Sequence, residues 1–159
     1  MPVKQEDLKL AIFAGGLLGG LAAVTWAALK GDPPAPLDRL VITSPYGAPR
    51  ESGLHGGVDI RAPEGTPIRA PFDGVFGHFR ADRPGFGGSL STQDGTTILL
   101  GHLSAYCRPD GDWVEAGDIL ALSGKTGHTN GPHVHLEALR HGVRVDPVAL
   151  FPDWPWEAA

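Results

Sequence analysis

Cysteine is almost absent from this chain of 159 residues, which contains only Cys107. A lone cysteine cannot form a disulfide within the chain, so no disulfide framework supports the fold, and we expect Cys107 to be a small core residue. Positive charge is also scarce, because 13 Lys and Arg face 18 Asp and Glu and the net charge is -5. A chain without a basic field holds phosphates weakly, which argues against a nucleic-acid partner.

Long helical patterns are missing from the sequence after residue 36. The chain has 23 Gly and 15 Pro, and short runs rich in Val, Ile, Leu and Thr alternate with turn signals such as Asp73-Gly74 and Asp94-Gly95. Such runs are too short for typical helices and are typical of β-strands. The sequence therefore predicts a mainly β fold, a compact antiparallel and sandwich-like β-sheet, with the glycine-rich stretch 83–89 as an exposed flexible loop.

One long hydrophobic run differs from this pattern. Residues 10–29 contain no charge, and as a helix they would span about 30 Å, which matches the hydrocarbon core of a bilayer. We predict a transmembrane helix or signal anchor at 10–29, after a short tail at 1–9. A Gly/Pro linker at 30–36 and a single domain at 37–159 complete the expected organisation, since the length leaves room for one core.

The hydrophobic run has two other interpretations. A cleaved signal peptide usually has an apolar region of about 7 to 15 residues, and this one follows a leader that contains Glu6 and Asp7. Cleavage after Ala27 stays open and would give a secreted protein. A buried core helix is disfavoured because the run has no polar face.

Glycines within the run have a spacing that bears on association. Gly15, Gly16, Gly19 and Gly20 form two overlapping GxxxG patterns, which let transmembrane helices approach closely and would permit helix-mediated self-association. The alternative is that they only lower the hydrophobicity of the helix. The flanking lysines give little positive-inside bias, so the orientation has to follow from the function.

The pattern HGGVD, from His55 to Asp59, is the first candidate for metal chemistry. In a straight strand these two residues would lie about 13 Å apart, which is too far for one ion, so the chain must curl there. Gly56 and Gly57 supply backbone freedom for that curl. The alternative is a surface loop with an ordinary polar histidine and aspartate.

The pattern HVH is the second candidate. In a strand, His133 and His135 would face the same side about 6.6 Å apart, while Val134 turns to the core. Both imidazoles could bind a metal, or one could bind it while the other acts on bound water. Two solvated histidines on an edge strand are the alternative, although the preceding loop, rich in Gly, Thr and Asn, favours a cleft.

The remaining histidines have weaker individual cases. His102 ends an apolar strand, where a histidine is more often a satisfied core or edge residue. His128 could line a cleft together with Asn130 and Tyr46, each of which also has an ordinary turn or packing role. The other two histidines are interpreted as turn or surface residues, and they are His78 and His141.

A series of short motifs follows in order along the chain: SPYG, HGGVDI, PEGTPIRAPFDGVF, LLGHLS, VEAGDILALSGKTG, NGPHVHLE and VRVDP. Together these motifs closely resemble the lysostaphin and LytM type of murein zinc metalloendopeptidase. The resemblance runs from about residue 41 to residue 148. It implies that His55, Asp59 and His135 are the ligands of a zinc ion, Zn²⁺. It also implies that His102 and His133 are catalytic histidines that do not bind the metal.

This sequence departs from the family pattern at Gly101, where the family often has alanine, and at 128–130, where small Ser or Thr residues are common. The resemblance implies an endopeptidase that hydrolyses peptide bonds in peptidoglycan. Such a substrate would place a single-pass protein in the cytoplasmic membrane, with its catalytic domain in the periplasm or outside. The alternatives are a non-catalytic regulator of cell-wall amidases, which would have lost site residues, and a phage lysis endopeptidase.

Overall fold

The computed structural model describes residues 35–51 and 53–159. The predicted tail at 1–9, the predicted membrane helix at 10–29 with its GxxxG glycines, and the linker at 30–36 apart from its last two residues lie outside these ranges. Within them, the structure contains no helix of the length and apolarity that a membrane crossing requires.

The described part of the chain consists mostly of short strands, as its alternating apolar runs predict. Its elements are, in order, β1 (Leu40–Ser44), β2 (Pro49–Arg50), β3 (Gly53–Leu54), β4 (Val58–Arg61), β5 (Pro67–Arg69), β6 (Gly74–Ala81), β7 (Gly85–Ser91), β8 (Thr96–Tyr106), β9 (Asp112–Val114), β10 (Ile119–Ser123), β11 (His133–Arg140), β12 (Val143–Val145), α3 (Pro147–Leu150) and β13 (Trp156–Ala158). The prediction of a mainly β fold is confirmed.

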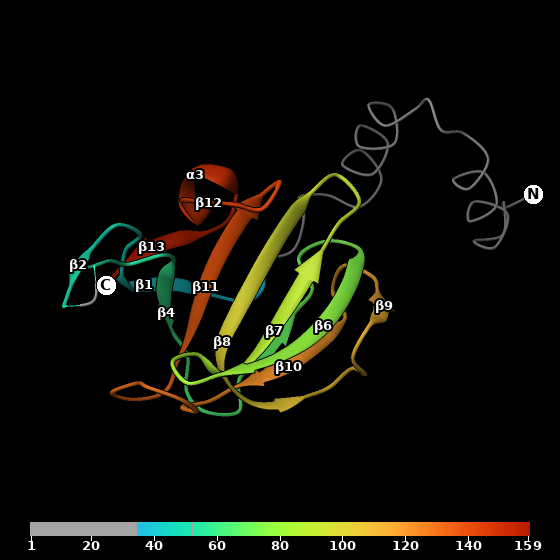
Figure 1. Cartoon of the computed structure of the whole chain (residues 1–159), viewed down its shortest axis with the longest axis horizontal. Coiled ribbons are helices and arrows are strands. Elements are labelled where there is room, and N and C mark those ends of the chain that lie inside the picture. The colour runs from blue at the N-terminus through green and yellow to red at the C-terminus, as the bar shows by residue number, and fades with distance from the viewer. Residues whose placement is uncertain (1–34, 52) are drawn as a thin grey trace, which may run out of the picture. The chain divides into compact units, whose positions relative to one another are not determined.

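One large sheet contains all of these strands except the small β2–β3 hairpin. Its strands follow the order β13-β1-β4-β11-β8-β7-β6-β9 (Figure 1). Beside this path, β10 pairs with β8 and β5, and β12 pairs with β11. Every recorded pairing is antiparallel apart from that of β1 with β13. The sheet therefore brings β4, β11 and β8 side by side, although they are far apart in the sequence.

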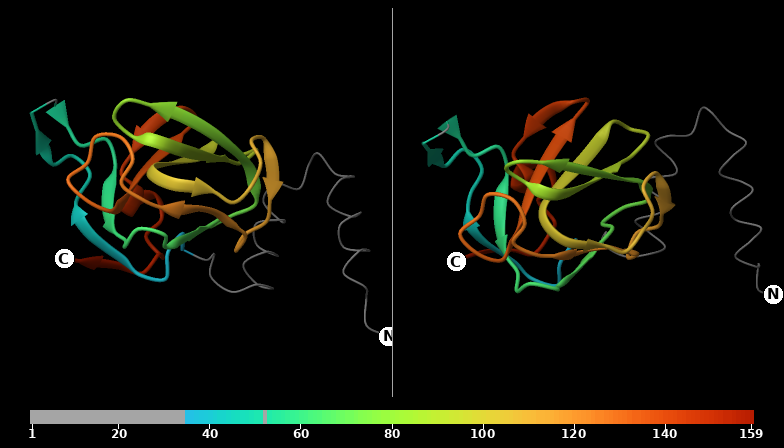
Figure 2. Two further views of the ribbon diagram at one scale, coloured as in Figure 1. Left: turned by 90° about the horizontal axis from the view of Figure 1, so that it is seen from below. Right: turned by 60° about the horizontal axis from the view of Figure 1, so that its bottom comes forward.

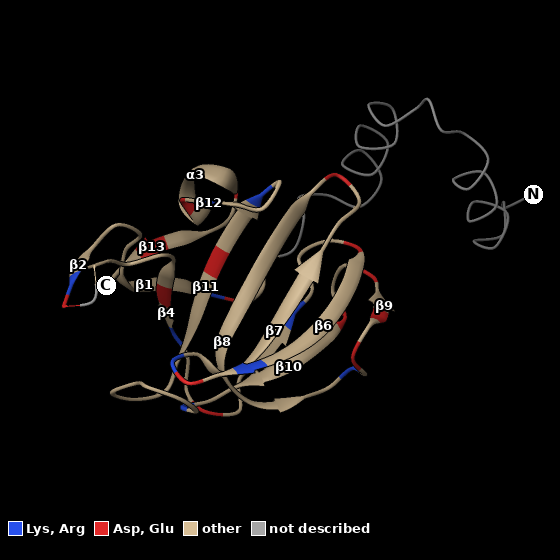
Figure 3. Ribbon diagram, viewed as in Figure 1, with Lys and Arg blue, Asp and Glu red and all other residues tan. Residues whose placement is uncertain are grey.

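The core lies against the inner face of the central strands. On β8 and β11, buried apolar residues alternate with residues of the opposite face, and Ile98, Leu100, Val134 and Leu136 are fully buried. Neither β7 nor β8 carries a charged residue, as Figure 3 shows. The alternation of buried and opposite-face residues on β8 and β11 fixes the register of these strands, since a slip by one residue would turn the core side chains to the other face.

The glycine-rich stretch 83–89 is not the flexible loop that the sequence predicts. From Gly85 onward it forms β7, which pairs along its whole length with β6. A Cβ atom at Gly87 would lie 2.2 Å from the Phe79 ring, and one at Gly88 would lie 2.6 Å from the Phe76 ring. The glycines therefore make room for two phenylalanine side chains on the partner strand.

The long strand β8 changes partners along its length, and the sheet bends there (Figure 2). It pairs with β11 up to Gly101 and with β7 up to Leu103, whereas residues 103–106 pair with β10. His102 lies at the change with a φ of 61°. Such a conformation is costly for a residue with a side chain and is typical of functional sites.

Cys107 follows β8 and is exposed, so the prediction that it is a core residue is wrong.

Candidate functional site

A groove of about 950 Å³ runs over the face of β4, β11 and β8 that is opposite the core. We call it the central groove. The five site residues predicted from the sequence all line this groove, and they are His55, Asp59, His102, His133 and His135. His128 and Asn130 line it as well. Tyr46, which is 36% exposed, is not among the lining residues.

Three of these side chains converge on one point of the groove. His55, Asp59 and His135 each offer a donor atom within 4.8 Å of the other two, as a single bound ion requires. His55 Nε2 lies 3.1 Å from His135 Nδ1 and 3.2 Å from Asp59 Oδ1, and His135 Nδ1 lies 2.8 Å from the same oxygen.

The curl that the HGGVD pattern predicts is present, because His55 precedes β4 and folds back over Asp59. The role of the glycines differs from the prediction, since neither Gly56 nor Gly57 has a positive φ. A Cβ atom at Gly57 would instead lie 2.3 Å from the backbone oxygen of Leu136. Gly57 is therefore required for the close approach of the loop to β11.

Backbone carbonyls orient two of the imidazoles. His55 Nδ1 donates to the carbonyl of Pro45 over 2.9 Å, and His133 Nδ1 donates to the carbonyl of Gly131 over 3.0 Å. A hydrogen bond at one ring nitrogen fixes which nitrogen carries the proton. Each ring consequently directs Nε2 toward Asp59, whose Oδ1 is 3.5 Å from His133 Nε2.

His135 is oriented by a carboxylate rather than by a carbonyl. Its Nδ1 lies in the three-residue cluster, and its Nε2 lies 3.2 Å from Oε1 of Glu137. Glu137 is held in turn by Arg144 of β12 over 2.5 Å. Burial lowers the pKa of His135, but the hydrogen bonds to Asp59 and Glu137 outweigh it and raise that pKa to about 9.

Asp59 is the most strongly stabilised anion of the groove. Burial raises its pKa, but hydrogen bonds from the three neighbouring imidazoles and from Arg50 hold it well below the usual range. Arg50 Nη2 contacts Asp59 Oδ2 at 2.5 Å and Ser44 Oγ at 3.0 Å. The other carboxylate oxygen, Oδ1, thus faces the histidines.

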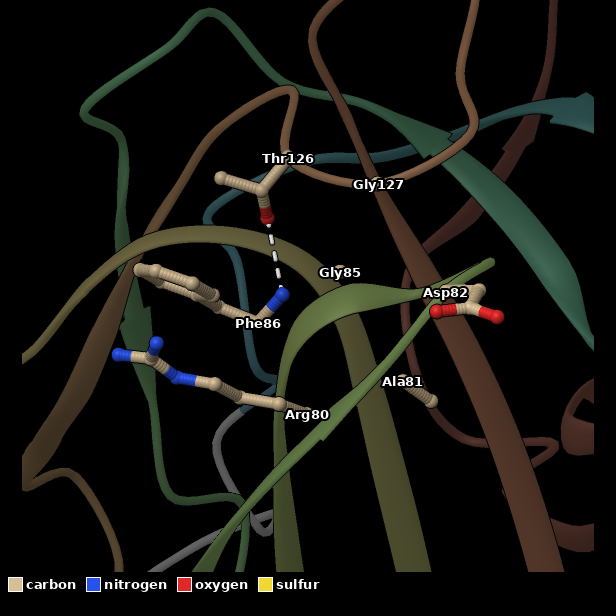
Figure 4. A pocket seen from close by; sticks show the side chains of 7 residues that line it. All are labelled: Arg80, Ala81, Asp82, Gly85, Phe86, Thr126 and Gly127. Carbon is tan, nitrogen blue, oxygen red and sulfur yellow. Dashed lines mark hydrogen bonds between the residues drawn. The ribbon is translucent and has the colours of Figure 1, made fainter.

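His102 comes from the bend of β8 and is held from two sides. Its backbone N–H donates to Pro84 over 2.7 Å, and its Nδ1 donates to the carbonyl of Thr126 over 2.8 Å. The Thr126 hydroxyl accepts from the backbone N–H of Phe86, as Figure 4 shows, and donates to the carbonyl of Leu103. Thr126 therefore ties the β6–β7 hairpin to the strand that carries His102.

The ring of His102 lies beside that of His133, with 4.5 Å between the centroids. Burial lowers the pKa of His102, so this ring is neutral at neutral pH. The pKa of His133 is raised, mainly by its hydrogen bond to Asp59. Two imidazoles with opposite pKa shifts thus lie next to the cluster, and opposed shifts of this kind are common where acid and base roles are divided.

Sequence reasoning overlooked four residues that support the site. Glu137 could have been found, because it is two residues from His135 on the same strand and shares its face. The other three have no spacing signal, because each contacts the site from another strand or loop: they are Arg50, Thr126 and Arg144. The two histidines interpreted as turn or surface residues, His78 and His141, do not line the groove.

Two imidazole nitrogens and one carboxylate oxygen are a donor set that suits zinc, and three protein ligands are typical of catalytic rather than structural zinc sites. Two further histidines, His102 and His133, line the groove beside the cluster. Fold and site therefore have the features of a hydrolytic metal centre on a β-sheet scaffold.

Residues 53–147 match Peptidase family M23, and the chain belongs to this family. The predicted relationship to murein metallopeptidases is thereby confirmed. The matched region begins just before His55 and ends at the start of α3, so it contains all five predicted site residues.

Named relatives agree with this assignment. Over 99 residues the chain is 39% identical to the DD-carboxypeptidase/endopeptidase Mpg of Neisseria meningitidis, which covers 61% of this chain and 23% of Mpg. Over 94 residues it is 37% identical to the peptidoglycan DD-endopeptidase ShyA of Vibrio cholerae, covering 58% of this chain and 22% of ShyA. The chain thus spans about a quarter of the length of these curated relatives.

Solved structures share the fold. The crystal structure of a zinc-containing peptidase from Vibrio cholerae superimposes with a TM-score of 0.66 at 26% identity, over 70% of this chain and 37% of that one. The β-sheet around the central groove is therefore the scaffold of this peptidase family.

Proposed function

We propose that this protein is a zinc-dependent endopeptidase that hydrolyses peptide bonds in bacterial peptidoglycan. The observation that carries the proposal is the convergence of His55, Asp59 and His135 within 4.8 Å, on the floor of a groove that two more histidines border. Membership of family M23 and the likeness to a peptidoglycan DD-endopeptidase support the choice of substrate. The non-catalytic alternative is not favoured, because all five residues are present.

His55, Asp59 and His135 would hold the zinc ion. When bound, zinc supplies a Lewis acid that acidifies a water molecule and polarises a peptide carbonyl. The chain's own contribution begins with the orientation of these ligands by Pro45 and Glu137. Because both partners are fixed by the fold, little reorganisation is needed for metal binding.

His133 is the proposed general base. Its Nδ1–H is fixed on the carbonyl of Gly131, so Nε2, which faces Asp59, is the nitrogen that would accept a proton. The protonated ring would be stabilised by the same carbonyl and by the Asp59 carboxylate. His102, neutral and with Nδ1–H on Thr126, offers Nε2 as an acceptor and is suited to orient the attacking water beside His133.

Metal and rate measurements on single variants of the full-length protein in detergent test these roles. The wild type should carry about one zinc per chain, and His55→Ala and His135→Ala should lose both zinc and activity. His133→Ala should keep its zinc and lose about 10²-fold or more in kcat, and His102→Ala should also keep its zinc and turn over slowly. An active preparation without zinc would refute the proposal.

The proposed function also predicts where the protein is located in the cell. A polymer outside the cell requires the domain to be outside, so we propose that residues 10–29 anchor the chain in the cytoplasmic membrane. Carbonate extraction of cells that produce the full-length chain tests this placement. Recovery of the intact chain in the soluble fraction would contradict the anchor, whereas recovery of a shortened chain would indicate cleavage and secretion.

A further inference from the structure

The central groove carries more positive charge than the acidic chain as a whole would suggest. Four arginines line it, whereas only two carboxylates do: the arginines are Arg50, Arg61, Arg83 and Arg144, and the carboxylates are Asp59 and Glu137. The net charge of the chain is -5, so this excess is local. Charge of one sign in a cleft attracts substrates of the opposite sign.

Two of these arginines are already engaged by the site itself. Arg50 binds Asp59, and Arg144 binds Glu137, each over 2.5 Å. Arg61 differs from both, because its side chain is exposed and, among the residues that the structure describes, no carboxylate lies within ion-pair distance of it. Its positive charge is therefore available to a molecule in the groove.

The position of Arg61 ties this free charge to the reacting centre. Arg61 is the last residue of β4, two positions after Asp59, so both side chains lie on the groove face of the strand. It is also the cross-strand partner of His133 in the pairing of β4 with β11. Residues that are directly opposite in antiparallel strands have Cβ atoms about 4.5 to 5.5 Å apart.

We propose that Arg61 binds a free carboxylate of the substrate and makes the enzyme selective for anionic peptide cross-links. This inference rests on the proposed function and specifies its substrate class. An extended peptide advances about 3.3 Å per residue, so a carboxylate within about three residues of the scissile bond is in reach of an arginine beside His133. The planar guanidinium of arginine matches a carboxylate in a bidentate hydrogen-bonded pair.

The experiment compares pairs of cross-linked peptides that differ only in one group, a free carboxylate or the corresponding carboxamide, placed one to three residues from the scissile bond. The zinc-loaded full-length protein should prefer the carboxylate member of one pair by about 5- to 20-fold in kcat/KM. This preference should fall as ionic strength rises, a readout that needs no variant.

Arg61→Gln should reduce the preference to within about two-fold while hydrolysis of the carboxamide peptide stays unchanged, and Arg61→Lys should retain part of it. Arg69→Gln is the matched control, because Arg69 is exposed and lies outside the groove, where it contacts the Gly117 carbonyl. That variant loses the same charge and should keep the wild-type preference.

Three results would overturn the assignment of Arg61: a wild type that hydrolyses both members of every pair equally, a preference that survives in Arg61→Gln, or an equal loss on both members in that variant. In each of these cases the endopeptidase function would stand. A zinc-loaded wild type that cleaves no cross-linked peptide would instead refute the proposed function, and the role of Arg61 with it.

Discussion

Glu137→Gln is the substitution that most directly tests how the fold prepares the metal site. Glu137 lies outside the three-residue cluster, and its carboxylate faces Nε2 of His135 at 3.2 Å. The carboxylate orients the ring and would make its other nitrogen a better ligand for the proposed zinc ion. Glutamine has nearly the same shape and can still accept a hydrogen bond, so the substitution removes the charge and leaves the packing intact.

The size of the effect follows from burial and distance. The side chain of Glu137 is only 15% exposed, so solvent screens its interaction with His135 less than it would at an open surface. Loss of such an outer carboxylate typically lowers metal affinity by about 10- to 100-fold. We expect Glu137→Gln to raise the zinc dissociation constant by about that factor, and to lower activity only where zinc is not saturating.

Competition titration against a chromophoric zinc chelator measures the constant, and activity at saturating zinc separates loss of affinity from loss of catalysis. Glu157→Gln is the matched control, since Glu157 pairs with Arg39 at an exposed position and should bind zinc like the wild type. A dissociation constant within about two-fold of the wild-type value in Glu137→Gln would refute the reasoning.

Three further predictions concern pH, packing and the metal. In the metal-free protein the pKa of His135 is raised to about 9, and zinc must displace the proton that this ring carries. Zinc affinity should therefore increase about tenfold per pH unit up to about pH 9 and then level off. Zinc titrations across this pH range measure the affinity, and an affinity independent of pH would contradict the prediction. Gly57→Ala should lower the free energy of unfolding by about 1 to 3 kcal/mol in denaturant titrations, whereas Gly131→Ala, which has nothing within 4 Å of the added Cβ, should stay within about 0.5 kcal/mol of wild type. Chelation should abolish activity and lower Tm, and added zinc should restore both.

The strands and the grouping of the histidines could be predicted because they depend on local patterns. Alternation of apolar and polar residues in β11 predicts that His133 and His135 share a face, and the structure has them so. The spacing of His55 and Asp59 requires a curl, which is present. The roles of these residues as ligands and catalysts stay predictions.

What the sequence could not predict depends on side-chain contacts between strands. The stretch 83–89 has the composition of a loop, and only the rings of Phe76 and Phe79 on β6 explain its glycines in a strand. The same limit applies to Arg50, whose contact with Asp59 has no spacing signal. A local pattern states which residue types are present, whereas a tertiary contact requires the register of two strands.

The hydrogen bonds of Asp59 indicate how a site with so many polar groups can be stable before a metal binds. One buried carboxylate has three imidazoles and a guanidinium around it, so its charge is balanced by donors from the β2–β3 hairpin, from the loop before β4 and from β11. A buried charge without such partners would cost several kcal/mol. A divalent cation at the cluster would take over the charge balance that protons on the imidazoles provide, so metal binding exchanges protons for zinc in a site whose backbone is already in place. The sheet therefore supplies the geometry, and we expect the protonation of His135 to compete with binding of the metal.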